Sequence, residues 1–285
     1  MTSSSIAIVS DSTADIPDAV LDKYGINIVN NFVVIDGQSL EDRKEIGREQ
    51  FYSALPTMKS VPTTATAPPG VYQSLYQRLL SEGKDFILSI HASGKLSGIL
   101  NAATSAAQYF RNRVRVIDSF NISMGLGFQV IAAAEAAQAG ASLETILNLL
   151  DDVRSRTRVV AMLDTLEYIR RSGRVSWAKA RLGDLLRIKP FVEVLNGQVC
   201  SLGEVRTYHK GFIRLVELLQ KICPLERLAV LHTNAENQAR QFLEEVSDFV
   251  PDQTFLVNVT TVIGSHTGPN GLGFAAVLKH SPVDW

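Results

Sequence analysis

The sequence predicts an α/β protein of two domains: an N-terminal parallel-sheet domain of the Rossmann-like type and a C-terminal mixed α+β domain. The chain has 285 residues, which is longer than a typical single domain of roughly 100–200 residues. Short apolar runs alternate with helical segments through the first half, a pattern typical of a parallel sheet covered on both faces. Later in the chain the pattern changes to a hairpin and mixed elements. We therefore place the domains at 1–152 and 153–285.

In the first half, each apolar run ends in a polar segment and leads into a helical stretch. Strands are expected at 6–9, 86–90 and 114–117. Helices are expected from Pro17 and over 71–80, 97–110, 122–139 and 143–156. Ligands of open parallel sheets bind beyond the carboxyl ends of the strands. Those ends are rich in Ser, Thr, Asp and Asn here, so we expect polar binding groups there.

In the second half, two apolar runs flank the dipeptide Asn196-Gly197, which is the most favoured sequence of a two-residue hairpin turn. The hairpin strands are expected at 191–195 and 198–206. The elements expected after it are helices at 209–222 and 235–246 and strands at 228–232, 255–259 and 273–278.

The composition is that of an ordinary globular protein, with 46% hydrophobic and 20% charged residues. A formal net charge of −1 gives no electrostatic reason to expect nucleic acid or an acidic membrane as partner. Cys200 and Cys223 follow no metal or redox spacing. The first residues lack a basic segment, and no stretch reaches about 18 consecutive apolar residues. We expect a cytoplasmic protein with no stable membrane insertion.

Two polar segments in the first half are candidate anion sites. Residues 62–70 hold three threonines between prolines, whose hydroxyls can donate to an anion; a capped loop before the helix is the alternative. Residues 93–98 look superficially like a phosphate loop but lack its Gly and its Ser or Thr, having Ser89 and Leu96 there. The Ser93 hydroxyl and helix-start amides can still hold a carboxylate, or form a plain strand-to-helix turn.

A third candidate is the glycine-rich segment 263–273, expected to be a loop with His266 at its centre. Four glycines indicate special dihedral angles or close approach of the backbone to another group. A purely structural histidine is the alternative. The other histidines show no metal-ligand spacing with each other or with acidic residues, so we expect no metal and no cofactor. They are His91, His209, His232 and His280.

A fourth candidate is a basic cluster earlier in the chain, and arginine suits bidentate recognition of phosphate or carboxylate. It comprises Arg170, Arg171, Arg174, Arg181, Arg187 and Lys189. A solvated helix face is the alternative. Because the sequence lacks a dinucleotide fingerprint, a nucleophile elbow and a zinc-protease motif, the candidate residues are more typical of a site that holds an anion than of an active site.

Taken together and in order, these segments resemble the DegV family over essentially the whole chain. The stretches that carry the resemblance are 10–17, 62–64, 93–98, 118–119, 123–127, 166–169, 173–175, Gly183, Leu186, 188–190 and 264–271. The resemblance implies two α/β domains that enclose one long-chain fatty acid, such as palmitate, stearate or oleate, in a buried tunnel between them. It also implies a binding protein, not an enzyme, that presents the carboxylate to a separate ATP-dependent fatty acid kinase for acyl-phosphate formation.

Carried over to this chain, the resemblance implies that Thr64 and Ser93 bind the carboxylate, with His266 nearby. Gly94 stands where the family usually has a second serine, and Thr63 can substitute because the family's loop sequence is altered after Thr64.

The resemblance further implies that Arg174, with Arg171 in the same basic cluster, faces the phosphate or the kinase. A buried methylene contributes about 0.8 kcal/mol, so a dry tunnel can supply most of the affinity. An autonomous phosphotransferase or hydrolase using the same cleft, and a lipid-loaded sensor, stay open as alternatives.

Overall fold

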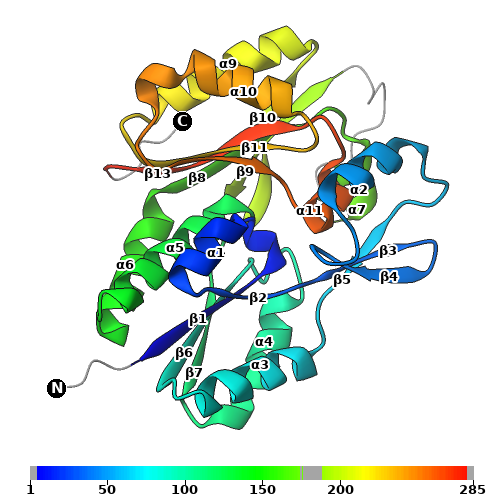
Figure 1. Ribbon diagram of the computed structural model, residues 1–285. Coiled ribbons are helices and arrows are strands. Elements are labelled where there is room, and N and C mark those ends of the chain that lie inside the picture. The colour runs from blue at the N-terminus through cyan, green and yellow to red at the C-terminus, as the bar shows by residue number, and fades with distance from the viewer. Residues whose placement is uncertain (1–4, 174, 176–187, 281–285) are drawn as a thin grey trace.

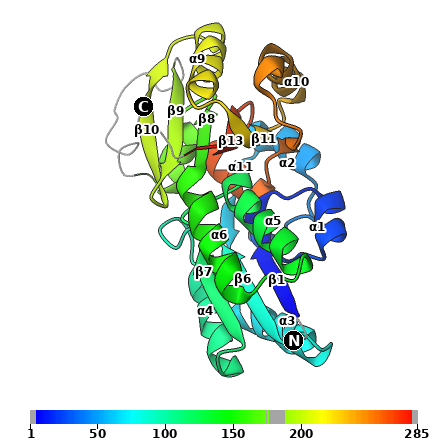
Figure 2. The ribbon, with the colours of Figure 1, turned by 90° about the vertical axis from the view of Figure 1, so that its left-hand side faces the viewer.

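The computed structural model describes residues 5–173, 175 and 188–280 of the chain. In these residues the strands form one parallel sheet, one large mixed sheet and one small antiparallel sheet (Figure 1). The α/β class predicted from the sequence is confirmed. Figure 2 shows the parallel sheet below the mixed sheet, with helices α9 and α10 at the opposite end of the molecule from α3 and α4.

The parallel sheet has the strand order β2-β1-β6-β7. Its strands are β2 (Asn27–Val29), β1 (Ile6–Asp11), β6 (Phe86–His91) and β7 (Val114–Asp118). Three of them are the predicted ones, and β2 is an edge strand that the sequence analysis did not single out. Every residue of β1 is buried, as expected for a parallel strand covered on both faces.

Helices cover the parallel sheet on both faces (Figure 1). Those described in this half are α1 (Asp18–Tyr24), α3 (Pro69–Ser81), α4 (Ile99–Ala107), α5 (Met124–Gln138) and α6 (Leu143–Arg156). Helix α5 is buried on all sides over residues 124–134, because it contacts strands of both large sheets. A helix that is apolar all round requires such a central place.

The mixed sheet has the strand order β10-β9-β8-β13-β11-β12, and only β11 and β12 pair in parallel. Its strands are β8 (Thr157–Met162), β9 (Lys189–Leu195), β10 (Gln198–Val205), β11 (Leu225–His232), β12 (Thr254–Asn258) and β13 (Leu272–Leu278). The predicted hairpin is confirmed, since Asn196 and Gly197 connect β9 to β10 with φ of 49° and 77°. Positive φ at both positions is what this turn type requires.

Helices α9 (Tyr208–Lys221) and α10 (Glu236–Glu245) cover the outer face of the mixed sheet. Alternate residues of β11 divide between the two faces: Leu228 and Val230 pack with α9 and α10, whereas Ala229 and Leu231 pack with the core around α5. The boundary that we placed at 152/153 falls inside α6, which ends at Arg156 directly before β8.

Two local expectations were wrong. The segment 62–70 is not all loop, because β5 (Thr63–Ala65) pairs with β3 (Phe32–Ile35). These strands and β4 (Gln38–Glu41) form the small antiparallel sheet.

The segment around His266 is also not a loop. It is the short helix α11 (Thr261–Thr267), whose first turn is capped by the Thr260 hydroxyl. Gly264 has a packing role in this helix, since a Cβ there would lie 2.3 Å from the Tyr52 hydroxyl. The glycines that indicated a loop therefore partly mark close packing against α2 (Arg48–Ala54).

Candidate functional site

An apolar pocket lies on the inner face of the mixed sheet, where α7 (Glu167–Ser172), α11 and the residues directly before α5 meet it. Its volume is about 150 Å³. The sheet contributes aliphatic side chains from alternate positions of neighbouring strands, Val159, Ala161, Val192, Val194 and Leu231. An apolar pocket of this size accepts apolar ligands. The pocket is therefore suited to hydrocarbon.

At the pocket wall, His266 of α11 contacts Thr64 of β5, in the small antiparallel sheet. The Nε2 atom of His266 lies 3.0 Å from the hydroxyl oxygen of Thr64, and His266 lines the pocket. Thr64 is held in register by its pairing with Val33 on β3, and α11 packs against both β3 and β5. The structure thus brings together two of the predicted residues, both of which can donate to a carboxylate.

The neighbouring Thr63 does not share this position. Successive side chains of a strand point to opposite faces, and Thr63 is exposed whereas Thr64 is half-buried. Thr63 therefore lies on the face of β5 away from His266.

Ser93 and Gly94 have partners within the protein. The buried Ser93 hydroxyl donates to the Gly197 carbonyl oxygen at 2.8 Å and accepts from the Lys95 amide at 3.2 Å. The Gly94 amide donates to an Asp118 carboxylate oxygen at 3.2 Å. A Cβ on Gly94 would lie 2.9 Å from a methyl carbon of Leu100. A serine at Gly94 would therefore require only that the end of the Leu100 side chain move.

Of the two predicted phosphate or kinase contacts, Arg171 is in α7 and pairs with Glu167 at 2.6 Å. Its side chain is 46% exposed and lines a polar surface pocket between α7 and the segment that leads into β5. Arg174 lies outside the described residues, as do Arg181 and Arg187.

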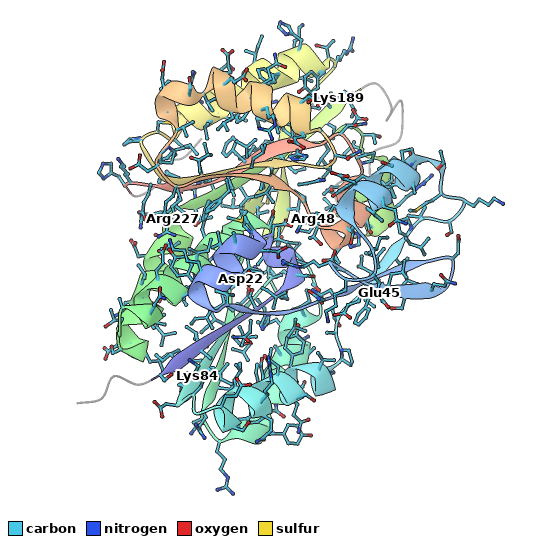
Figure 3. All side chains as sticks on the ribbon, in the orientation of Figure 1. Asp22, Glu45, Arg48, Lys84, Lys189 and Arg227 are labelled. Carbon is cyan, nitrogen blue, oxygen red and sulfur yellow. The ribbon has the colours of Figure 1, made fainter. Side chains whose placement is uncertain are left out.

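A buried polar cluster that the sequence analysis missed holds the start of α11. An Asp15 carboxylate oxygen accepts from the Thr260 amide at 2.8 Å, and the other accepts from the Ser123 hydroxyl at 2.7 Å. Arg48 lies 3.4 Å from the same carboxylate, beside α11 in Figure 3. Burial raises the pKa of Asp15 to about 6, although Arg48 opposes this shift. The hydroxyls of Thr260 and Thr261 both donate to Asp42.

A second buried cluster has the order of groups found in serine hydrolases. His91 Nδ1 lies 2.9 Å from Asp11, and its Nε2 lies 2.7 Å from the Ser89 hydroxyl, which in turn lies 2.8 Å from the Tyr76 hydroxyl. Burial alone would raise the pKa of Asp11, but the hydrogen bond and charge of His91 bring this pKa below its usual value. All four side chains are fully buried, so this cluster is structural.

Within the described ranges, no three His, Cys, Asp or Glu side chains are grouped so that they could bind a metal ion. No helix in the part of the chain that the structure covers is long and apolar enough to cross a bilayer.

The fold and the pocket define a class of α/β protein with a parallel and a mixed sheet, in which an apolar pocket lies against the mixed sheet beside a hydroxyl–imidazole pair. A family model described as uncharacterised protein, DegV family, matches residues 5–279. A DegV domain-containing protein of Streptomyces coelicolor is 36% identical over 273 residues, which are 94% of this chain and 96% of that protein. The chain belongs to the DegV family.

Solved structures agree with this assignment. A DegV family protein from Thermus thermophilus, described by its fatty acid binding, superposes with a TM-score of 0.89 at 32% identity and covers 96% of this chain and 99% of that one. DegV of Bacillus subtilis, described as a fatty acid binding protein, has a TM-score of 0.86 at 31% identity, with 97% and 100% covered.

Proposed function

We propose that this chain binds one long-chain fatty acid, with its hydrocarbon in the apolar pocket, extended as a buried tunnel, and its carboxylate at Thr64 and His266. The observation that carries this proposal is the 3.0 Å approach of His266 Nε2 to the Thr64 hydroxyl at the wall of a pocket whose surface is mostly apolar. The fatty acid binding described for the Thermus and Bacillus relatives supports it.

The energetics of this arrangement favour retention of a long chain. Burying ten methylenes contributes about 8 kcal/mol at about 0.8 kcal/mol each, before the cost of immobilising the ligand. The carboxylate then needs enough donors to offset its desolvation. A hydroxyl and an imidazole can supply these without enclosing the carboxylate in a salt bridge.

The second part of the proposal is that the bound carboxylate is presented to a separate ATP-dependent kinase, which forms the acyl phosphate. Arg171, on the exposed side of α7 beside the segment that leads to Thr64, supports a contact surface there. A hydrolase in this chain itself is disfavoured, because the Ser89, His91 and Asp11 side chains have no exposed surface.

The decisive experiment is native mass spectrometry of the purified protein, followed by organic extraction and then by addition of palmitate, stearate or oleate. One fatty acid per chain is the expected result. Ala161 lines the pocket, and Ala161→Phe should abolish binding because the larger side chain fills it. The matched change Ala139→Phe at an exposed position should leave binding unchanged. A protein that is empty and takes up none of the three acids would overturn the proposal.

A further inference from the structure

The turn of the β9–β10 hairpin is bonded to the loop after β6. The Ser93 hydroxyl donates to the Gly197 carbonyl oxygen at 2.8 Å, and the Lys95 ammonium donates to the Asn196 carbonyl oxygen at 3.0 Å. The loop that follows strand β6 of the parallel sheet therefore holds the β9–β10 turn of the mixed sheet through two backbone carbonyls.

The contact between this turn and Ser93 is direct. A Cβ built on Gly197 would lie 2.4 Å from the Ser93 hydroxyl oxygen and 3.2 Å from the ring of Phe120. Since Gly197 also has a φ of 77°, a side chain there would strain the turn and push it away from Ser93.

This contact lies at the edge of the apolar pocket. Val194 and Val199, on either side of the turn, line the pocket, and so does Leu96 in the loop that holds the turn. The bonds from Ser93 and Lys95 therefore keep one part of the pocket wall in place.

The Ser93 hydroxyl has a single proton to donate, and in the structure this proton goes to Gly197. Leu96 of the same loop and His266 both line the pocket, so a carboxylate held at His266 lies beside this loop. It would compete for the Ser93 proton, because a hydrogen bond to a charged acceptor is roughly twice as strong as one to a neutral carbonyl. The same proton cannot serve both acceptors at full strength.

We propose that the carboxylate bound at Thr64 and His266 also accepts from the Ser93 hydroxyl, which gives up its hydrogen bond to the Gly197 carbonyl, so that loading with fatty acid releases the β9–β10 turn. This inference rests on the proposed function. It explains how binding of a fatty acid changes the surface of the protein. Leu195 and Phe120 flank the turn and are 42% and 37% exposed. A released turn rearranges these apolar side chains, and a protein partner can thereby distinguish loaded from empty molecules.

The expected size of the effect follows from one neutral hydrogen bond. Such a bond is worth about 1 kcal/mol, so its loss increases the opening of the turn by about fivefold. The bond from Lys95 to Asn196 is unaffected and keeps the hairpin in its overall position.

The test is ¹⁵N NMR of the Gln198 amide, whose nitrogen is bonded to the Gly197 carbonyl and responds to its hydrogen bond. Palmitate should shift this resonance and increase hydrogen exchange of the 192–200 segment by about fivefold. Hexadecane, delivered from cyclodextrin, fills the same pocket without a carboxylate and should leave both unchanged. Equal responses to the two ligands, or a Gln198 resonance that palmitate does not shift, would overturn the inference.

Variants provide the controls. Ser93→Ala should place the Gln198 resonance at its released position without ligand, and palmitate should then move it no further. Gly197→Ala should give the same released state by steric contact, with Ser93 intact. Ser97→Ala, in the same loop but with its hydroxyl accepting from the Ile99 amide, should behave as wild type.

The two proposals can fail separately. Palmitate binding is measured independently by native mass spectrometry in the same samples. Absence of binding would overturn the proposed function, whereas binding without a response at Gln198 would overturn only the role of Ser93.

Discussion

The imidazole of His266 and the hydroxyl of Thr64 lie 3.0 Å apart, although 202 positions separate these residues in the chain. The pair joins α11 to the edge strand β5. Its imidazole lines the apolar pocket.

Replacing Thr64 by valine keeps the shape of the side chain and removes its hydroxyl. A hydrogen bond to a charged group is worth about 1.5–3 kcal/mol, so the affinity for palmitate should fall at least about tenfold. Displacement of a fluorescent fatty acid measures this. Thr63→Val, on the exposed face of the same strand, is the matched control and should bind normally. Equal losses in both variants would remove Thr64 from the carboxylate site.

Replacing His91 by glutamine should lower the free energy of unfolding by about 2 kcal/mol, because it removes one of the hydrogen-bond partners of the buried Asp11 carboxylate. Urea denaturation at pH 7 measures the change. His209→Gln alters an exposed histidine and should be nearly neutral. A His91→Gln protein as stable as wild type would show that Asp11 does not depend on this contact.

The buried Asp15 should make stability depend on pH. Its pKa is raised from 3.8 to about 6 in the folded protein, so the folded state binds more protons than the unfolded state between these values. Its contribution is therefore fully present below about pH 4 and is lost as the pH rises through 6.

Between pH 4.5 and 7, wild type should lose about 2 kcal/mol of stability relative to Asp15→Asn, which cannot titrate. Urea denaturation of both proteins across this range is the measurement. A difference between them that stays constant with pH would contradict the raised pKa.

Gly268 lets α7 pack against the end of α11. A Cβ there would lie 2.3 Å from the Tyr168 ring, and the φ of Gly268 is 78°. Gly268→Ala should therefore destabilise the protein clearly more than Gly37→Ala, since Gly37 has a φ of 82° but no atom within 4 Å of the added carbon. Thermal unfolding of the two variants measures the combined cost of the contact with Tyr168 and of the Gly268 backbone, whose ψ of 178° at positive φ is almost confined to glycine. Equal losses would mean that neither is costly.

Arg171→Ala and Arg174→Ala should each spare palmitate binding and reduce acyl-phosphate formation. The assay contains the loaded protein, ATP and the catalytic subunit of a bacterial fatty acid kinase, with hydroxylamine to trap the product. Arg240→Ala is a matched control, because Arg240 pairs with Glu236 at 2.6 Å on α10 as Arg171 does with Glu167. Loss of palmitate binding in either arginine variant would instead place that arginine at the carboxylate.

Local patterns explain how much of the fold was predictable. The apolar runs of β1, β6 and β7, the Asn196-Gly197 turn and the helix over residues 143–156 all depend on neighbours in the sequence, and the structure confirms each one. The small antiparallel sheet was not predictable in this way. Its strands β3 and β5 are short, and β5 is stabilised mainly by a partner about 30 positions away.

For the candidate site too, some features follow from the sequence and others only from the tertiary structure. The sequence by itself determined which residues are candidates for binding an anion, among them Thr64, Ser93 and His266. A sequence motif specifies the residue type, and hence the functional group, at each of its positions. The tertiary structure decided which of them meet. It placed His266 on a helix against Thr64 and directed the Ser93 hydroxyl to Gly197. It also anchored α11 on Asp15, 245 positions away. Such contacts depend on how sheets and helices pack across the whole chain, and no local pattern of residues encodes that packing.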